Sequence, residues 1–296
     1  MNQQEWADCP AGRNGVELLQ ARFERHVYDR HMHDTYAIGV TLRGVQRFWC
    51  RGSYHDSTPG QVIVIRPGEV HDGRSGVAGG YAYRMFYVRP DVLQGLDDGT
   101  RQDACEFTAA GPIVSNPAVF SVLNAAWTAV ALSPSSLASD ELLLRSLSML
   151  ATKASERPKS PTSRNDPVLK RVRDYLHERV GRTVTMSELS ALSSLSRFQL
   201  TRQFQQRYGL PVHGYLRHLR LEEAKRRLAR GHEIAVVAAD LGFVDQSHFH
   251  HRFRGSYGVT PGQWRAAHGY KTTRTPAPYP EPKSRDGTTR RRSEAF

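Results

Sequence analysis

The feature that most constrains the fold is an apolar pattern in the C-terminal half that recurs after 49 residues. Shifting the sequence by this distance places Leu192 on Leu241 and Leu200 on Phe249. The same shift aligns further pairs: Leu195 with Val244, Phe204 with Phe253, Tyr208-Gly209 with Tyr257-Gly258, and Tyr215 with Trp264. The polar residues between these positions differ. Because only the apolar skeleton is repeated, the chain is expected to form two similar small cores with different surfaces.

Each copy has the signals of two short helices joined by a tight turn. In the first copy, Thr185-Met-Ser-Glu188 and Ser196-Arg-Phe-Gln199 are capping boxes, each at the start of a helix. In the second, Ile234–Leu241 predicts the first helix, Gly242 the turn and Asp245 the cap of the next helix. The chain therefore contains two predicted helix-turn-helix units.

A longer helix is predicted between the two units. It covers Val212–Arg230 and ends before Gly231, a residue suited to the end of a helix. Glu222/Arg226 and Glu223/Arg227 are spaced four residues apart, where opposite charges stabilise a helix.

The second unit contains the sequence Asp245-Gln-Ser-His-Phe-His-His-Arg-Phe253, with three histidines close together. Phe249 and Phe253 are four residues apart and are expected to point inward. The start of the second helix of such a unit enters the major groove of DNA, where Gln, His and Arg side chains contact bases or phosphates. A solvated surface and a metal site are the alternatives. His248 and His251 could share a metal, but no third ligand follows, and this half of the chain has no cysteine for a zinc finger.

Residues 16–114 have the pattern of a small antiparallel barrel or sandwich. Tyr36–Arg43 alternates, Gln61–Ile65 is a short apolar strand, and Tyr81–Val88 is rich in residues that favour strands. Helical spacing follows, with Asn116-Pro117 as a cap and two helices predicted up to Ala154. These helices are expected to cover the strands, to pair with a second copy of the chain, or both. The fold class is therefore α+β, with two domains.

Charge and composition divide the chain at the same place. Residues 1–156 contain 14 Lys or Arg against 17 Asp or Glu, whereas residues 167–267 contain 17 against 8. The basic part is the candidate for a polyanionic partner. Residues 157–166 are rich in Pro and Ser and predict a linker, and residues 268–296 predict a disordered basic tail. Three widely spaced cysteines and the lack of a long apolar run predict a cytoplasmic protein with no membrane segment.

The C-terminal region resembles the DNA-binding domain of the AraC/XylS family of bacterial transcription regulators. The resemblance covers about residues 167 to 266 and is carried by Ala239–Phe253 and by Tyr257-Gly258-Val-Thr-Pro261. It implies seven helices, with two reading helices in successive major grooves of double-stranded DNA. The residues that it places at the DNA are Arg197, Phe198, Thr201, Arg202, Gln246, Ser247, His250 and His251. The family often has an arginine where His251 stands.

The N-terminal region resembles the cupin-like sensor domain of the same family. His31-Met-His33 is similar to the first cupin motif, and Gly60 followed by Gly68-Glu-Val-His71 to the second. A metal-binding cupin adds a glutamate after the first pair, where this chain has Ala37 and Ile38, so no metal is expected. Glu69 and Asp72 are the acids that could substitute. The predicted effector-binding residues are His31, His33, Arg47, Arg66, His71 and Arg84.

The sequence therefore predicts a transcription regulator that binds DNA and responds to a small-molecule effector. No nucleophile and base are brought together by any motif, so we expect no enzyme activity, catalytic residue or cofactor. The expected partners are DNA, the effector, RNA polymerase and a second copy of the chain, in the cytoplasm at the nucleoid. The alternatives are a cupin-type metalloenzyme with a DNA-binding appendage, and a DNA-binding protein without an effector.

Overall fold

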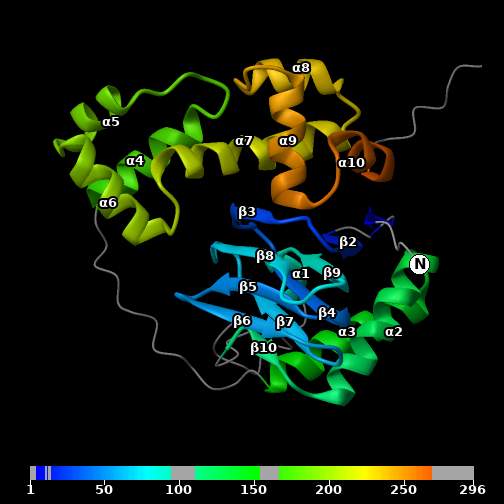
Figure 1. Ribbon diagram of the computed structural model, residues 1–296. Helices are drawn as coiled ribbons and strands as arrows, with labels where there is room; N and C mark the ends of the chain where they lie inside the picture. Colours follow the sequence, from blue (N-terminus) through cyan, green and yellow to red (C-terminus); the bar gives the residue numbers. More distant parts are fainter. Residues whose placement is uncertain (1–4, 11, 13–14, 95–110, 154–166, 269–296) are drawn as a thin grey trace, which may run out of the picture.

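The computed structural model describes residues 5–10, 12, 15–94, 111–153 and 167–268, and these form two domains (Figure 1). The N-terminal domain is made mainly of strands, and a helical C-terminal domain lies across one end of it. The predicted α+β class is therefore confirmed. The predicted linker, and the predicted tail except for His268, lie outside the described residues.

The N-terminal domain consists of two sheets whose paired strands are antiparallel. The first sheet has the order β1 (Trp6–Asp8), β2 (Val16–Phe23), β9 (Tyr81–Val88), β4 (Tyr36–Gly44), β7 (Val62–Ile65) and β10 (Ile113–Val114). The second has the order β3 (Tyr28–His31), β8 (His71–Ser75), β5 (Gln46–Cys50) and β6 (Ser53–Ser57). The strands do not close into one continuous barrel, and the domain is a double-sheet structure of the cupin-like type.

Two apolar layers lie on opposite sides of the first sheet. Ile38 and Val40 of β4 pack with helices α2 (Pro117–Leu132) and α3 (Leu137–Lys153). Ala37 faces the other way, into the space between the sheets. The alternation read from the sequence is thus confirmed, and so is the Asn116 cap, whose side chain accepts from the Ala118 and Val119 amides. A short helix, α1 (Pro90–Gln94), follows β9.

Residues 167–268 form seven helices, as the family resemblance implies. They are α4 (Pro167–Glu178), α5 (Met186–Ser193), α6 (Arg197–Tyr208), α7 (Val212–Ala229), α8 (Ile234–Asp240), α9 (Gln246–Tyr257) and α10 (Pro261–His268). We call α5 and α6 the first unit, and α8 and α9 the second unit. Helix α7 joins them (Figure 1). None of the helices described is both long and apolar enough to cross a membrane.

The helix signals are confirmed, with two corrections. Both capping boxes form, and Asp245 caps α9 by accepting from the His248 amide. Val244, however, is 86% exposed, and Phe243 takes the expected place in the core. Glu222 is not paired with Arg226 in the ion pairs of the described residues; Glu222 accepts instead from the Tyr257 hydroxyl at 2.7 Å.

Candidate nucleic-acid interface and sensor pockets

Helix α6 presents one row of predicted DNA-contacting residues to solvent. Phe198 is 76% exposed, Arg197 and Arg202 are also exposed, and Thr201 is half-buried. Opposite this row, Leu200 and Phe204 are fully buried in the first unit. The Arg197 guanidinium donates to the Ser187 hydroxyl at 2.6 Å, which connects the start of α6 to α5.

Helix α9 divides the histidine-rich segment between two sides. Gln246, Ser247, His250 and His251 are exposed to solvent. Arg252 turns the other way, and its guanidinium lies 3.4 Å from the Asp29 carboxylate of β3. The segment therefore combines an exposed polar face, buried phenylalanines and a contact between domains.

The C-terminal ends of both reading helices rest on the N-terminal domain. Gly209 and Gly258 cap α6 and α9 in the left-handed conformation, with φ of 76° and 74°. A Cβ atom at Gly209 would lie 2.6 Å from Val70, and one at Gly258 would lie 2.2 Å from the Tyr28 hydroxyl. These contacts leave the N-terminal ends of both helices pointing away from the domain junction.

A buried lysine ties the linking helix to β2. Lys225 of α7 donates to the Glu17 carboxylate at 2.9 Å and lies over the rings of Tyr257 and Trp264 at 5.0 and 4.4 Å. Burial lowers the pKa of Lys225, but Glu17 and Glu222 outweigh burial and leave this pKa above its ordinary value. The lysine is therefore charged, and the junction depends on its carboxylate partners.

Three histidines from the cupin-like motifs meet below the junction. Among the described residues, His31, His33 and His71 are the group able to hold a metal ion, with ligand atoms that all lie within 4.8 Å of one another. All three side chains are buried. The histidine-rich segment of α9 is not such a group. The structure thus brings together the three histidines of the predicted effector site.

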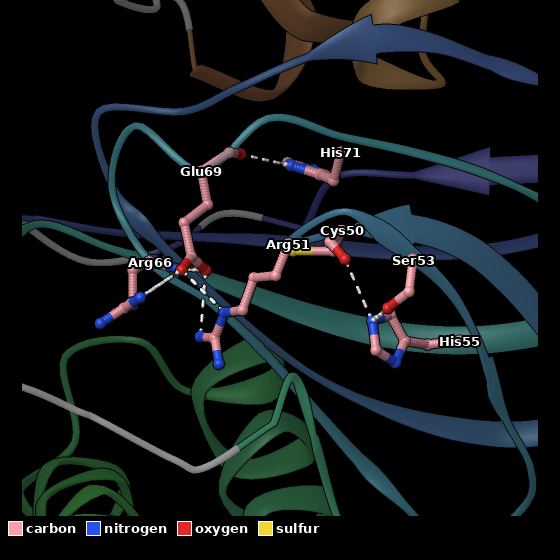
Figure 2. A network of polar contacts seen from close by, with 7 residues as sticks. All are labelled: Cys50, Arg51, Ser53, His55, Arg66, Glu69 and His71. Carbon is pink, nitrogen blue, oxygen red and sulfur yellow. Dashed lines mark hydrogen bonds and ion pairs between the residues drawn. The ribbon is translucent and has the colours of Figure 1, made fainter. Parts of the chain in front are cut away.

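The three predicted arginines lie elsewhere. Arg47 pairs with Asp56, and Arg84 donates to Asn124 and Thr128 of α2. Figure 2 shows the Glu69 carboxylate held between Arg51 and Arg66, at 2.8 and 2.6 Å. Asp72 accepts from the Trp49 amide at 2.8 Å. The two acids expected as substitutes for a cupin glutamate are therefore held by other partners, and neither belongs to the histidine cluster.

Two cavities of different size lie in the N-terminal domain and at its rim. The space between the sheets, lined by Tyr28, His31, His71 and Tyr83 among others, has a volume of about 30 Å³. A pocket of about 380 Å³ lies at the rim and is lined by Gly12, Gly15, Val16, Glu17, Thr35, Tyr87, Arg89, Ala267 and His268. The sequence did not point to this rim pocket, because its residues come from β2, β9, α10 and the segments beside the strands, and they follow no motif.

Comparisons with known proteins agree with this geometry. Residues 13–147 match the family described as the AraC-like ligand binding domain, and residues 189–267 match a helix-turn-helix domain. The class defined by the fold and the site is a DNA-binding transcription regulator with a ligand-binding domain. The chain thus has the two-domain organisation of AraC-type regulators, a ligand-binding domain followed by a helix-turn-helix domain.

Relatives and solved structures extend over most of the chain. The uncharacterized HTH-type transcriptional regulator YbfI of Bacillus subtilis is 28% identical over 79% of this chain and 85% of its own length. The transcriptional activator RhaS of Pectobacterium carotovorum is 25% identical over 82% of this chain and 89% of its own. The structure of ToxT from Vibrio cholerae, 11% identical, superimposes with a TM-score of 0.58 over 86% of this chain and 99% of that one. YbfI is named as a transcriptional regulator and RhaS as a transcriptional activator, which favours a regulator over the enzyme alternative, and ToxT shows the same fold.

Proposed function

We propose that this regulator reads two successive major grooves of DNA with the N-terminal ends of α6 and α9. The observation that carries the proposal is the opposed orientation of these ends. Their polar residues are exposed, while Gly209 and Gly258 at the other ends rest on the N-terminal domain. A duplex can therefore approach both helices without displacing the N-terminal domain.

The exposed residues suit different tasks at the duplex. Arg202 can donate two hydrogen bonds to a guanine, and Gln246 can pair in a bidentate manner with an adenine. Arg197 is held by Ser187 and is suited to a phosphate, which fixes orientation rather than sequence. His250 and His251 lie next along α9, where an imidazole can contact a base edge or a phosphate.

The two reading helices can be separated by mutation. Arg202→Ala is expected to relax specificity in one half of the operator, and Gln246→Ala in the other half about 10 base pairs away, each by about 1–3 kcal/mol. Selection from a randomised operator library measures both effects. Arg265→Ala is the matched control, because Arg265 lies on α10 and pairs with Glu233 at the start of α8, so the substitution removes a positive charge that is on neither α6 nor α9. Loss of discrimination at the same base pairs in both variants would contradict the proposal.

The proposed effector site is the rim pocket between β2, β9 and α10. Its volume of about 380 Å³ falls in the range of small-molecule sites, whereas the inner cavity of about 30 Å³ holds only one or two waters. The pocket is lined from both domains, so a ligand there contacts them differently when their arrangement changes. Such a difference in contacts is what an effector needs in order to shift an equilibrium.

A substitution that fills the rim pocket tests whether the effector binds there. A thermal-shift screen of carboxylic acids, amino acids and sugars is expected to give compounds that raise the melting temperature of the native protein. Thr35→Phe, which fills the pocket, is expected to remove that response, while Arg47→Ala, on the outer face of β5, keeps it. A response unchanged in Thr35→Phe would place the effector elsewhere.

The proposal also includes a homodimer. Leu132 and Leu137, at the ends of α2 and α3, are 79% and 82% exposed, and Leu144 is also exposed. Leu137→Glu is expected to convert a dimer into monomers in sedimentation experiments, and a native protein that sediments as a monomer would contradict it. A contact with RNA polymerase and a location in the cytoplasm at the nucleoid belong to the same proposal.

A further inference from the structure

The three buried histidines form a compact triangle at the mouth of the double sheet. The ring of His31 lies 4.8 Å from that of His33 and 4.3 Å from that of His71, and the rings of His33 and His71 are 5.0 Å apart. All three side chains are buried, at 6%, 4% and 6% exposure. Their ligand atoms all lie within 4.8 Å of one another, so the three rings face a common point.

Backbone carbonyls orient two of these rings. The Nδ1 atom of His31 is 2.6 Å from the Asp29 carbonyl, and that of His71 is 2.9 Å from the Glu69 carbonyl (Figure 2). A histidine that donates from Nδ1 to a carbonyl keeps a lone pair on Nε2, as in most metal-bound histidines. The cluster thus offers three nitrogen lone pairs, one for each ring. The Nε2 atom of His33 is buried and has no hydrogen-bond partner within the described residues.

We infer that His31, His33 and His71 bind one divalent transition-metal ion of the class that prefers imidazole nitrogen, such as zinc or cobalt. Three histidines with an open fourth position are an established ligand set for zinc. Nitrogens on a tetrahedral zinc lie about 3.4 Å apart, given bonds of about 2.0–2.1 Å. Ligand atoms within 4.8 Å reach this spacing by small rotations of the side chains.

The adjacent cavity supplies room and a partner for the fourth position. His31 and His71 line this space of about 30 Å³ together with Gln46. The Oε1 atom of Gln46 is buried without a hydrogen-bond partner among the described residues. A water bound to the metal fits the volume and donates to such an acceptor. The metal and its water would thus give partners to two buried polar atoms, the Nε2 atom of His33 and the Oε1 atom of Gln46.

The same segment carries contacts to the C-terminal domain. Asp29 pairs with Arg252 of α9, and Asp34 lies 3.8 Å from the His218 imidazole of α7. His31 and His33 lie between these two acids in the sequence. A bound ion therefore restrains the segment on which the second unit is docked. The metal site itself does not depend on the proposed function.

Metal binding to the untagged, full-length protein tests the inference. After removal of metals with a chelator, equilibrium dialysis is expected to give one Zn²⁺ per chain, and Co²⁺ is expected to give visible absorption bands. His33→Ala and His71→Gln are expected to weaken Zn²⁺ binding at least about 100-fold, since each removes one of three ligands. His55→Ala is the matched control, because its Nε2 atom lies 3.1 Å from the Cys50 carbonyl (Figure 2) and His55 does not belong to the cluster.

Hydrogen exchange tests the consequence for the domains. Zn²⁺ is expected to slow exchange in Tyr28–Asp34 and at the C-terminal end of α9, and to leave α6 unchanged. Metal binding and hydrogen exchange of the native protein test the site even if a variant fails to fold. Absence of stoichiometric Zn²⁺ or Co²⁺, or equal binding in the folded His33→Ala and His71→Gln variants, would overturn the site. Binding without slower exchange would overturn the link to docking. Neither result bears on DNA recognition, which is measured separately.

Discussion

The two helix-turn-helix units share one apolar pattern but build their turns differently. In the first unit, residues 194–196 connect the helices, and Ser194 takes the left-handed conformation at φ 56°. In the second, residues 241–245 connect them, and Gly242 takes it at φ 71°. The earlier turn in the second unit lets Phe243 enter the core and leaves Val244 exposed. A repeated core therefore tolerates two turns of different length.

The units also differ in how they are attached to the N-terminal domain. Phe249, Phe253 and Tyr257 of the second unit belong to the same apolar core as Tyr28 and Tyr83 of the double sheet. The first unit meets that domain through Met32 and Val70. Changes within the N-terminal domain should therefore reach the second unit more strongly. Four predictions test this difference, from the largest effect to the smallest.

The largest effect is expected from removing one buried phenylalanine in each unit. Phe204→Ala and Phe249→Ala should each cost about 3–5 kcal/mol of unfolding free energy, because both side chains are fully buried. Only Phe249→Ala should also speed hydrogen exchange in β3. Urea denaturation and hydrogen exchange measure these effects. Phe198→Ala, at an exposed position, should change stability by less than about 0.5 kcal/mol, and equal exchange in β3 in both core variants would refute the difference.

The next effect is expected from the ion pair between Glu17 and Lys225. Glu17→Gln leaves the lysine charged in a buried place, and removing one partner of such a pair costs about 3–5 kcal/mol. Because the Glu17 side chain is 31% exposed, we expect about 2–3 kcal/mol, measured by urea denaturation. Asp56→Asn, which breaks an exposed pair with Arg47, should cost less than about 1 kcal/mol. Similar costs for both variants would show that Lys225 does not need its partner.

A smaller effect separates the two capping glycines. Gly209→Ala and Gly258→Ala should each cost about 1–2 kcal/mol, because an alanine is strained in the left-handed conformation. Gly258→Ala should cost more, since its Cβ meets the buried Tyr28 hydroxyl, which is held at 2.5 Å from that of Tyr83. Thermal denaturation compares them. Adding Tyr28→Phe should recover part of the stability lost in Gly258→Ala but none of that lost in Gly209→Ala. If neither double variant recovers stability, the contact between residue 258 and the Tyr28 hydroxyl is contradicted.

The smallest effect concerns the caps of the reading helices. Ser196→Ala should cost about 0.5–1 kcal/mol, because Gln199 still accepts from the Ser196 amide at 3.0 Å. Asp245→Ala should cost about 1–2 kcal/mol, because it removes both a 2.6 Å bond to the His248 amide and a negative charge at the helix start. Urea denaturation measures both. Asp245→Asn keeps the hydrogen bond, so its loss of unfolding free energy should lie between those of Ser196→Ala and Asp245→Ala. A larger loss for Ser196→Ala than for Asp245→Ala would contradict this ranking.

Much of the fold could be predicted from the sequence because it depends on local signals. Capping residues, apolar spacing and the 49-residue repeat located α5 to α9, alternation located β4, and a composition that favours strands located β9. The exposure of Val244 was not predictable, since it depends on where the chain turns. In the site, the motifs singled out His31, His33 and His71, but only the pairing between β3 and β8 brings His31 opposite His71. The rim pocket and the Glu17–Lys225 pair join residues too distant in sequence to leave a pattern.

The continuous helix between the two units has a consequence for the duplex. Helix α7 has 18 residues, a length of about 27 Å at 1.5 Å per residue, and much of it is buried against both units. A packed helix does not lengthen, whereas the grooves of B-DNA recur about every 34 Å. The DNA must therefore bend to bring its two grooves to the reading helices. The free-energy cost of this bending depends on how easily the intervening base steps deform. Base pairs that no side chain touches should thus help to decide which operators are bound.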